Sequence, residues 1–249
     1  MASSPGMPRG APPGASLAPL SSPDTAFPPP DAPVSGVDQY TKYFISMRYW
    51  LLGCGYYQAL EALEYASRFH TGMRRDGVTR EYAHQLAIGH FVKTIAASLE
   101  HPQETLAAVF LHDVCEDYGI APEEIDQRFG PTVREAVWLL TKTFRGRPKP
   151  LADYYHAIAQ NRIASVVKGA DRIHNVQSMV GVFTLDKQKD YLRETQAHIL
   201  PALKEARRLF PRQEPAYENI KHMLKSQIEL LRAVHAAQER AAAPDVGKG

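Results

Sequence analysis

The chain has 249 residues, of which 44% are hydrophobic and 22% charged, enough to build one large domain or two small ones. Its formal net charge of +2 gives no indication of nucleic-acid or membrane-surface binding. The sequence contains no run of 18 apolar residues, so no membrane-spanning helix is predicted. Two cysteines, Cys54 and Cys115, and the lack of a secretory signal pattern predict a cytoplasmic protein.

Residues 1–36 differ in composition from the rest of the chain. They hold ten of the 19 prolines, and Gly, Ala and Ser fill most of the other positions. Such a segment has too few large apolar side chains to offset the entropy of ordering, so we expect a disordered tail. A Pro-rich docking segment is the alternative, suggested only by residues 27–30. We expect residues 37–240 to form the folded domain and residues 241–249 a frayed end.

The predicted domain is all-α, because apolar residues recur at helical spacing and no strand pattern or internal repeat is present. Residues 70–81 and 144–150 lack such a period and carry several basic side chains, so both are predicted loops that are solvated by default. The last two helices are long and amphipathic and are expected to serve as a scaffold or a homodimer surface. The predicted helices cover residues 37–52, 57–69, 84–99, 105–117, 122–129, 132–143, 163–179, 186–209 and 215–240.

Residues 105–117 combine an apolar run with a dense group of polar side chains. The run is apolar on every side of a helical wheel, as in a buried helix. If the helix continues, His112, Asp113, Glu116 and Asp117 fall within about 140° of one another. Burying these charges unpaired would cost several kcal/mol each, by order of magnitude, and a divalent cation would remove that cost. The alternative is a helix end that surfaces into water.

Two other helices offer polar side chains of the same kind. His84 lies on the apolar face of its helix, where a hydrogen-bonded core histidine is the alternative to a ligand. In residues 163–179, one face is apolar and the opposite face carries Lys168, Asp171 and Asn175. A solvated helix surface is the alternative there.

Together these residues resemble the HD superfamily of metal-dependent phosphohydrolases, and within it the RelA/SpoT-type (p)ppGpp hydrolase domain, including the stand-alone small alarmone hydrolases. Residues 111–117 (LHDVCED) are similar to the family's HD-x-x-ED signature, and residues 167–175 (VKGADRIHN) to its VKLADRLHN segment. His70 precedes His84 by fourteen residues, with the basic Arg75 between them. The resemblance covers residues 57–179 and implies an HD-domain helical bundle.

The resemblance also implies a reaction and the residues that perform it. The reaction is hydrolysis of the 3′-pyrophosphate of (p)ppGpp to GDP or GTP and pyrophosphate, which degrades the alarmone of the stringent response. The implied ligands of one Mn²⁺ ion are His84, His112, Asp113 and Asp171. The implied water-handling carboxylates are Glu116 and Asp117. The implied substrate-binding residues are Arg75, Lys142, Lys168 and Asn175, the last of which could instead brace the metal ligands.

Three positions depart from the family pattern. Gln85 replaces a usual proline, Asp76 replaces a basic residue, and Gly77 stands where a small polar residue is common. These departures leave other substrates open, such as (p)ppApp or NADPH, and an antidote role against a toxic synthetase is compatible with the same hydrolysis. A non-catalytic nucleotide-sensing module is the alternative from a different class of function. No segment after Met179 resembles a synthetase domain.

Overall fold

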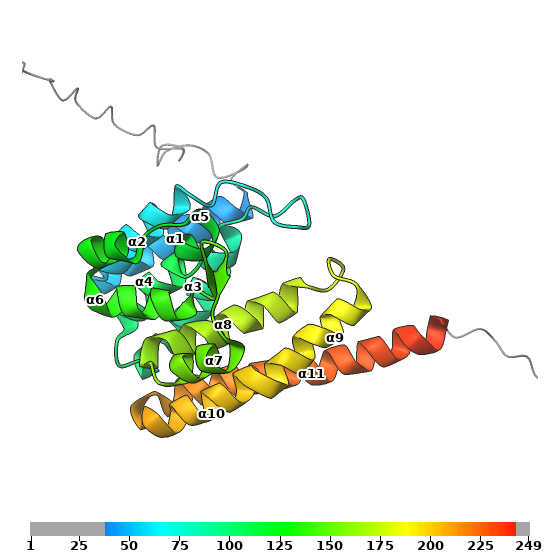
Figure 1. The fold of residues 1–249 in the computed structure, drawn as a ribbon. Helices are drawn as coiled ribbons and strands as arrows, with labels where there is room; N and C mark the ends of the chain where they lie inside the picture. Colours follow the sequence, from blue (N-terminus) through cyan, green and yellow to red (C-terminus); the bar gives the residue numbers. More distant parts are fainter. Residues whose placement is uncertain (1–37, 243–249) are drawn as a thin grey trace, which may run out of the picture. The chain divides into compact units, whose positions relative to one another are not determined.

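The computed structural model describes residues 38–242, and the prediction of an all-α fold is confirmed for them (Figure 1). The predicted tail at residues 1–36 lies outside this range, as do residues 243–249. No helix in the described range is long and apolar enough to span a bilayer. The helices are α1 (Gln39–Cys54), α2 (Tyr57–Ser67), α3 (Ala83–Ile95), α4 (Pro102–Leu111), α5 (Val114–Tyr118), α6 (Pro122–Leu140), α7 (Leu151–Ala159), α8 (Arg162–Ser178), α9 (Leu185–Glu194), α10 (Leu200–Leu209) and α11 (Glu214–Ala242).

Helix α4 forms the centre of the N-terminal part of the fold. It packs against α2, α3, α6 and α8, and every residue from Thr105 to Leu111 is buried. This agrees with a run that is apolar on all sides, since such a helix is stable only when neighbours cover its whole circumference. Because α4 is fixed from all directions, its C-terminal end is a rigid base for side chains that follow it.

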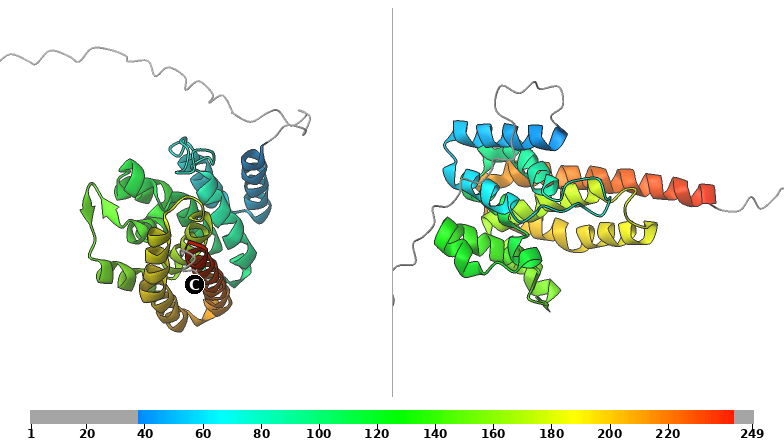
Figure 2. Two further views of the ribbon diagram at one scale, coloured as in Figure 1. Left: turned by 90° about the vertical axis from the view of Figure 1, so that its right-hand side faces the viewer. Right: turned by 90° about the horizontal axis from the view of Figure 1, so that it is seen from above.

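Helix α8 connects this part to the C-terminal helices. It packs against α3 and α4 and also against α10 and α11. Helix α11 runs beside α10 and α9 (Figure 1 and Figure 2). A separate apolar cluster joins the C-terminal end of α8 to α9 and to the middle of α11 through Val176, Met179, Leu192, Ile228 and Leu231. Neighbouring helices therefore cover α8 along most of its length. Polar residues of α8 are buried as a result, although the sequence alone was equally compatible with their exposure to solvent.

Close packing at Gly169 gives a testable consequence. A Cβ atom there would lie 2.7 Å from Ile220 Cγ2 and 3.1 Å from Leu203 Cδ2, distances that force both side chains to move. We expect Gly169→Ala to lower the free energy of unfolding by about 1–3 kcal/mol, as overpacked cores do. Urea unfolding followed by circular dichroism measures this change. The matched control is Gly53→Ala in α1, where nothing lies within 4 Å and alanine should be neutral or stabilising. A Gly169→Ala protein as stable as the parent would contradict the expectation.

The prediction of one helix over residues 105–117 is wrong. Helix α4 ends at Leu111, His112 and Asp113 form a turn, and α5 begins at Val114. The ring Nδ1 of His112 lies 2.8 Å from the carbonyl oxygen of Val109 and so occupies a carbonyl near the end of the helix. The backbone of Asp113 (φ −98°, ψ −9°) lies at the edge of the helical region, between the two helices. This break sets the direction in which the His–Asp pair projects.

After residue 129 the structure agrees with the predicted elements at one place and differs from them at others. The predicted break between residues 129 and 132 is confirmed, because α6 is kinked at Gly130 (φ 75°). Part of the predicted loop 144–150 is a hairpin of β1 (Thr143–Phe144) and β2 (Arg147–Pro148), closed by left-handed residues Arg145 and Gly146. Helix α7 was not predicted, and a π-helical turn, Thr195–Ile199, separates α9 from α10. The two-residue strands and the single π-helical turn are too short to give a periodic pattern in the sequence, whereas the nine residues of α7 were not assigned to any element.

Candidate functional site

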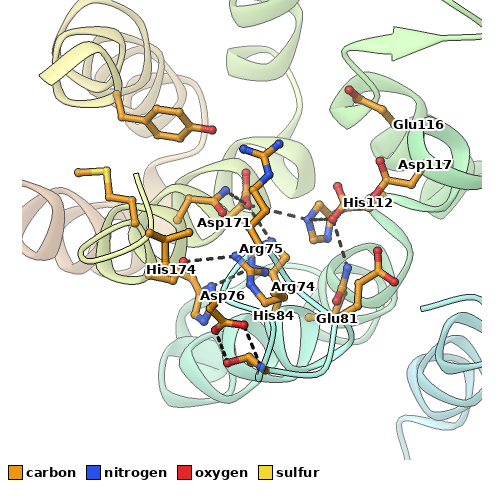
Figure 3. Close-up of a pocket in the computed structure, with 18 of the residues that line it drawn as sticks. Arg74, Arg75, Asp76, Glu81, His84, His112, Glu116, Asp117, Asp171 and His174 are labelled. Atoms are coloured by element: carbon orange, nitrogen blue, oxygen red, sulfur yellow. Dashed lines mark hydrogen bonds and ion pairs between the residues drawn. The ribbon is translucent and has the colours of Figure 1, made fainter. Parts of the chain in front are cut away.

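Three helical segments bring the predicted metal ligands together. His84 lies in the first turn of α3, His112 and Asp113 form the turn between α4 and α5, and Asp171 lies in the middle of α8. Helices α3, α4 and α8 pack against one another, so these side chains converge although 87 positions separate His84 from Asp171 (Figure 3). Both histidines and Asp171 are buried, with 5%, 5% and 4% of their surface exposed.

The ligand atoms lie at distances suited to one metal ion. His84 Nε2 is 3.2 Å from Asp171 Oδ1, and His112 Nε2 is 4.0 Å from the same oxygen and 3.0 Å from Asp113 Oδ2. His84, His112 and Asp113 each offer one atom within 4.8 Å of the other two. An ion with metal–ligand bonds of about 2.0–2.2 Å holds neighbouring ligands roughly 3–4 Å apart. The four side chains could therefore close around one divalent cation with small movements.

The charge balance around His112 also favours the binding of a metal cation among these four side chains. Its Nε2 atom is buried and makes no well-aligned hydrogen bond. Burial lowers the pKa of His112, but the charges of Asp113 and Asp171 and the contact with Asp113 raise it to about 9. Burial likewise raises the pKa of Asp113, and the positive charge of His112 more than reverses this, to about 2. Without a metal, a proton on His112 balances the carboxylates, and a divalent ion could replace that proton.

Two predicted substrate-binding residues contact Asp171 instead of pointing freely into solvent. Asn175 Nδ2 donates to Asp171 Oδ1 at 2.5 Å, and Lys168 Nζ donates to Asp171 Oδ2 at 3.0 Å. Burial raises the pKa of Asp171, but Lys168 and the two histidines hold it well below its usual value. These contacts fix the orientation of the carboxylate toward His84 and His112.

Two residues that were not predicted as part of the site contact the candidate metal ligands and orient them. His174 Nδ1 lies 2.8 Å from His84 Nδ1, and Gln85 Nε2 donates to Asp113 Oδ2 at 3.2 Å. Burial, together with the charges of His84 and Arg74, lowers the pKa of His174 to about 3, so this ring is neutral. His174 lies within the segment 167–175 quoted above, three positions after Asp171, which was the available signal. Gln85, a departure from the family pattern, thus holds a candidate ligand.

The two predicted water-handling carboxylates have different surroundings. Glu116 Oε2 accepts a hydrogen bond from the backbone amide of Lys142 at 2.7 Å, whereas Asp117 accepts none from the residues that the structure describes. Burial, then the charges of Asp113 and Glu116, raise the pKa of Asp117 to about 6. The ammonium group of Lys142 lies 3.6 Å from Glu194 Oε1.

All these predicted residues line one cavity of about 610 Å³. The predicted Arg75 lies over the Phe183 ring at 5.3 Å, and the neighbouring Arg74, which was not predicted, donates to Ser178 Oγ at 3.3 Å. Asp76 accepts hydrogen bonds from the backbone of Val78 and from Thr79 and so stabilises the turn that carries both arginines. The cavity thus combines a His–Asp cluster with cationic groups and an apolar wall formed by Met179, Val182, Phe183 and Tyr191.

Comparisons with known proteins find a similarity to HD domains. Residues 62–145 match the family model described as HD domain. The chain is 31% identical over 134 residues to the guanosine-3′,5′-bis(diphosphate) 3′-pyrophosphohydrolase of Vibrio cholerae and to the bifunctional (p)ppGpp synthase/hydrolase SpoT of Escherichia coli. It is 29% identical over 143 residues to the GTP pyrophosphokinase rsh of Brucella melitensis.

The similarity is confined to part of each relative. The matches cover 51% to 54% of this chain but 18% of each of these relatives. A solved structure of a metazoan ortholog of SpoT, described as hydrolysing ppGpp, has a similar fold, with a TM-score of 0.50 and 21% identity. That match covers 66% of this chain and 93% of the other. Residues 62–145 thus match the HD domain family, and the chain is similar in sequence to one part of the SpoT and Rsh proteins.

Proposed function

We propose that this chain is a metal-dependent phosphohydrolase that removes the 3′-pyrophosphate of (p)ppGpp, giving GDP or GTP and pyrophosphate. The observation that carries the proposal is the convergence of His84, His112, Asp113 and Asp171 in the same cavity as two further carboxylates and several cationic side chains. The names of the relatives support (p)ppGpp as the substrate. Two imidazoles and two carboxylates suit Mn²⁺, which is the proposed metal.

Each group in the cavity has a proposed part in the reaction. When bound, the metal would lower the pKa of a coordinated water and draw charge from a phosphate oxygen. Glu116 and Asp117 would orient this water and accept its proton. Arg74, Arg75 and Lys142 would bind phosphate oxygens as charge-assisted donors, since all three line the cavity. Lys168 and Asn175 would act on Asp171, through the contacts described above.

The nature of the released group tests this reaction. The purified chain with Mn²⁺ is incubated separately with ppGpp, pppGpp, ppApp and NADPH, and the products are separated by anion-exchange chromatography. We expect pyrophosphate and GDP from ppGpp, and the parallel chelator-treated sample should give none. Turnover of ppApp or NADPH without turnover of ppGpp would contradict the substrate, and turnover of none of the four would favour a nucleotide-sensing module.

Metal affinity should depend on pH because Mn²⁺ must displace the proton of His112. The pKa of His112 in the metal-free protein is about 9, so each bound ion releases about one proton at neutral pH. We expect the Kd for Mn²⁺ to fall roughly tenfold per pH unit between about pH 6 and pH 8, since less proton competes as the pH rises. Calorimetric titration in two buffers of different ionisation enthalpy measures the released proton directly. Equal heats in the two buffers would contradict this assignment.

A further inference from the structure

A second group of potential metal ligands lies beside the first. His70, Glu81 and Asp117 each offer one atom within 4.8 Å of the other two. His70 follows α2 and Glu81 precedes α3, so both flank the loop that carries the arginines, while Asp117 belongs to α5. The loop and the helix that follows the His–Asp pair thus meet at this cluster, of which Figure 3 labels Glu81 and Asp117.

His70 is buried in an orientation that leaves its nitrogens without hydrogen-bond partners. It is 3% exposed, and both ring nitrogens are buried and unpaired. Its ring stacks on Tyr82 at 5.7 Å and meets the edge of Tyr118 at 4.8 Å, so neighbouring rings fix its plane. Nδ1 is 3.8 Å from Glu81 Oε1, which is too long for a hydrogen bond. A buried polar group without a hydrogen-bond partner costs about 1–3 kcal/mol of stability. A metal ion bound to a ring nitrogen of His70 would remove this cost.

The two carboxylates complete the group. The Tyr118 hydroxyl donates to Glu81 Oε2 at 2.8 Å, which leaves Oε1 on the side of His70. Asp117 accepts no hydrogen bond from any group of residues 38–242, and within that range no lysine or arginine pairs with either carboxylate. Glu81 and Asp117 both line the large cavity, so one side of the cluster opens onto it.

We infer that His70, Glu81 and Asp117 bind a second divalent cation next to the first site. One imidazole and two carboxylates are suitable ligands for Mn²⁺, and the open side leaves room for water or a phosphate oxygen. The Asp117 amide donates to the Asp113 carbonyl at 2.8 Å, so one helical turn carries a ligand of each site. With Asp117 bound to this ion, Glu116 is the carboxylate that accepts the proton of the attacking water. The inference concerns metal binding, so it stands whichever nucleotide the chain hydrolyses.

The number of bound ions tests the second site. The full chain, freed of metal with a chelator, is dialysed to equilibrium against Mn²⁺, and bound manganese is measured by inductively coupled plasma mass spectrometry. We expect two ions per chain at saturation, and one for His70→Asn and for Glu81→Gln. Asp113→Asn should also retain one ion, because it removes a ligand of the first site only. Glu135→Gln, which alters an exposed carboxylate of α6 outside both clusters, is the matched control and should bind two.

Two results would overturn the inference: a parent chain that saturates at one ion, or two ions retained by both His70→Asn and Glu81→Gln. Circular dichroism melting identifies a variant that fails to fold. Glu81 is partly exposed, so Glu81→Gln should fold even if the buried His70→Asn does not. Electron paramagnetic resonance of the parent chain gives an independent measurement, because two neighbouring Mn²⁺ ions couple magnetically and one ion alone does not. Loss of that coupling in Glu81→Gln supports the site, and an uncoupled spectrum of the parent chain contradicts it.

Discussion

Asp171→Asn is expected to abolish Mn²⁺ binding at the first site and to lower the free energy of unfolding of the metal-free protein by about 3 kcal/mol. Asp171 is the counter-ion of Lys168, whose side chain is 18% exposed and has its ammonium 3.0 Å from Asp171 Oδ2. Removing one partner of a buried ion pair leaves the other charge without compensation, which is the usual cause of losses of about 3–5 kcal/mol. Calorimetric titration measures Mn²⁺ binding, and urea unfolding with a chelator present measures the free energy of unfolding of the metal-free protein.

A double variant separates the two effects of this change. Lys168→Met removes the unpaired charge, so Asp171→Asn combined with Lys168→Met should recover more than about 1 kcal/mol of stability relative to Asp171→Asn alone. The double variant should still lack the first metal site, because the ligand oxygen is absent. If Asp171→Asn unfolds at the same urea concentration as the parent chain, the ion pair does not stabilise the fold.

Glu116→Gln is expected to lower kcat for pyrophosphate release by about 10²- to 10⁴-fold, the usual contribution of a general base. The amide oxygen of glutamine can still accept the hydrogen bond from the Lys142 backbone, so the local structure should persist. Metal stoichiometry should stay unchanged, since Glu116 belongs to neither group of candidate ligands. Steady-state kinetics with ppGpp and Mn²⁺ dialysis measure the two quantities.

The control for Glu116→Gln is Glu123→Gln, which alters an exposed carboxylate in the first turn of α6 that does not line the cavity. It should keep the kcat of the parent chain. A Glu116→Gln enzyme with unchanged kcat and two bound ions would remove Glu116 from the proposed reaction. A loss of kcat accompanied by loss of metal would instead assign it a role in holding the ions.

Patterns within one helix were readable from the sequence. The run at residues 105–111 predicted a buried helix because it is apolar on every side, and α4 is enclosed by four neighbouring helices. The apolar face of residues 163–179 was predicted in the same way. Adjacency in the chain also placed Asp113 beside His112 without knowledge of the fold. Helical periodicity fixes which side chains share a face, and this depends on local geometry alone.

Contacts between helices were not readable in this way. The sequence placed Lys168 and Asn175 on one face with Asp171, and the structure turns both onto that carboxylate inside a covered helix. It gave no reason to pair His174 with His84, or His70 with Glu81 and Asp117. Residues 144–150 were expected to form a loop because strands of two residues carry no period.

By itself, then, the sequence determined the all-α fold, the His112–Asp113 pair and, through family resemblance, the other candidate ligands. The tertiary structure decided which polar groups face the ligands and which bind one another. Asp171 shows the reason, because the covering of α8 by its neighbours leaves this carboxylate bound to Lys168 and Asn175 instead of to solvent. Whether a polar side chain meets solvent, a partner or a metal depends on the neighbouring helices that cover it, and their arrangement follows from the packing of the whole core.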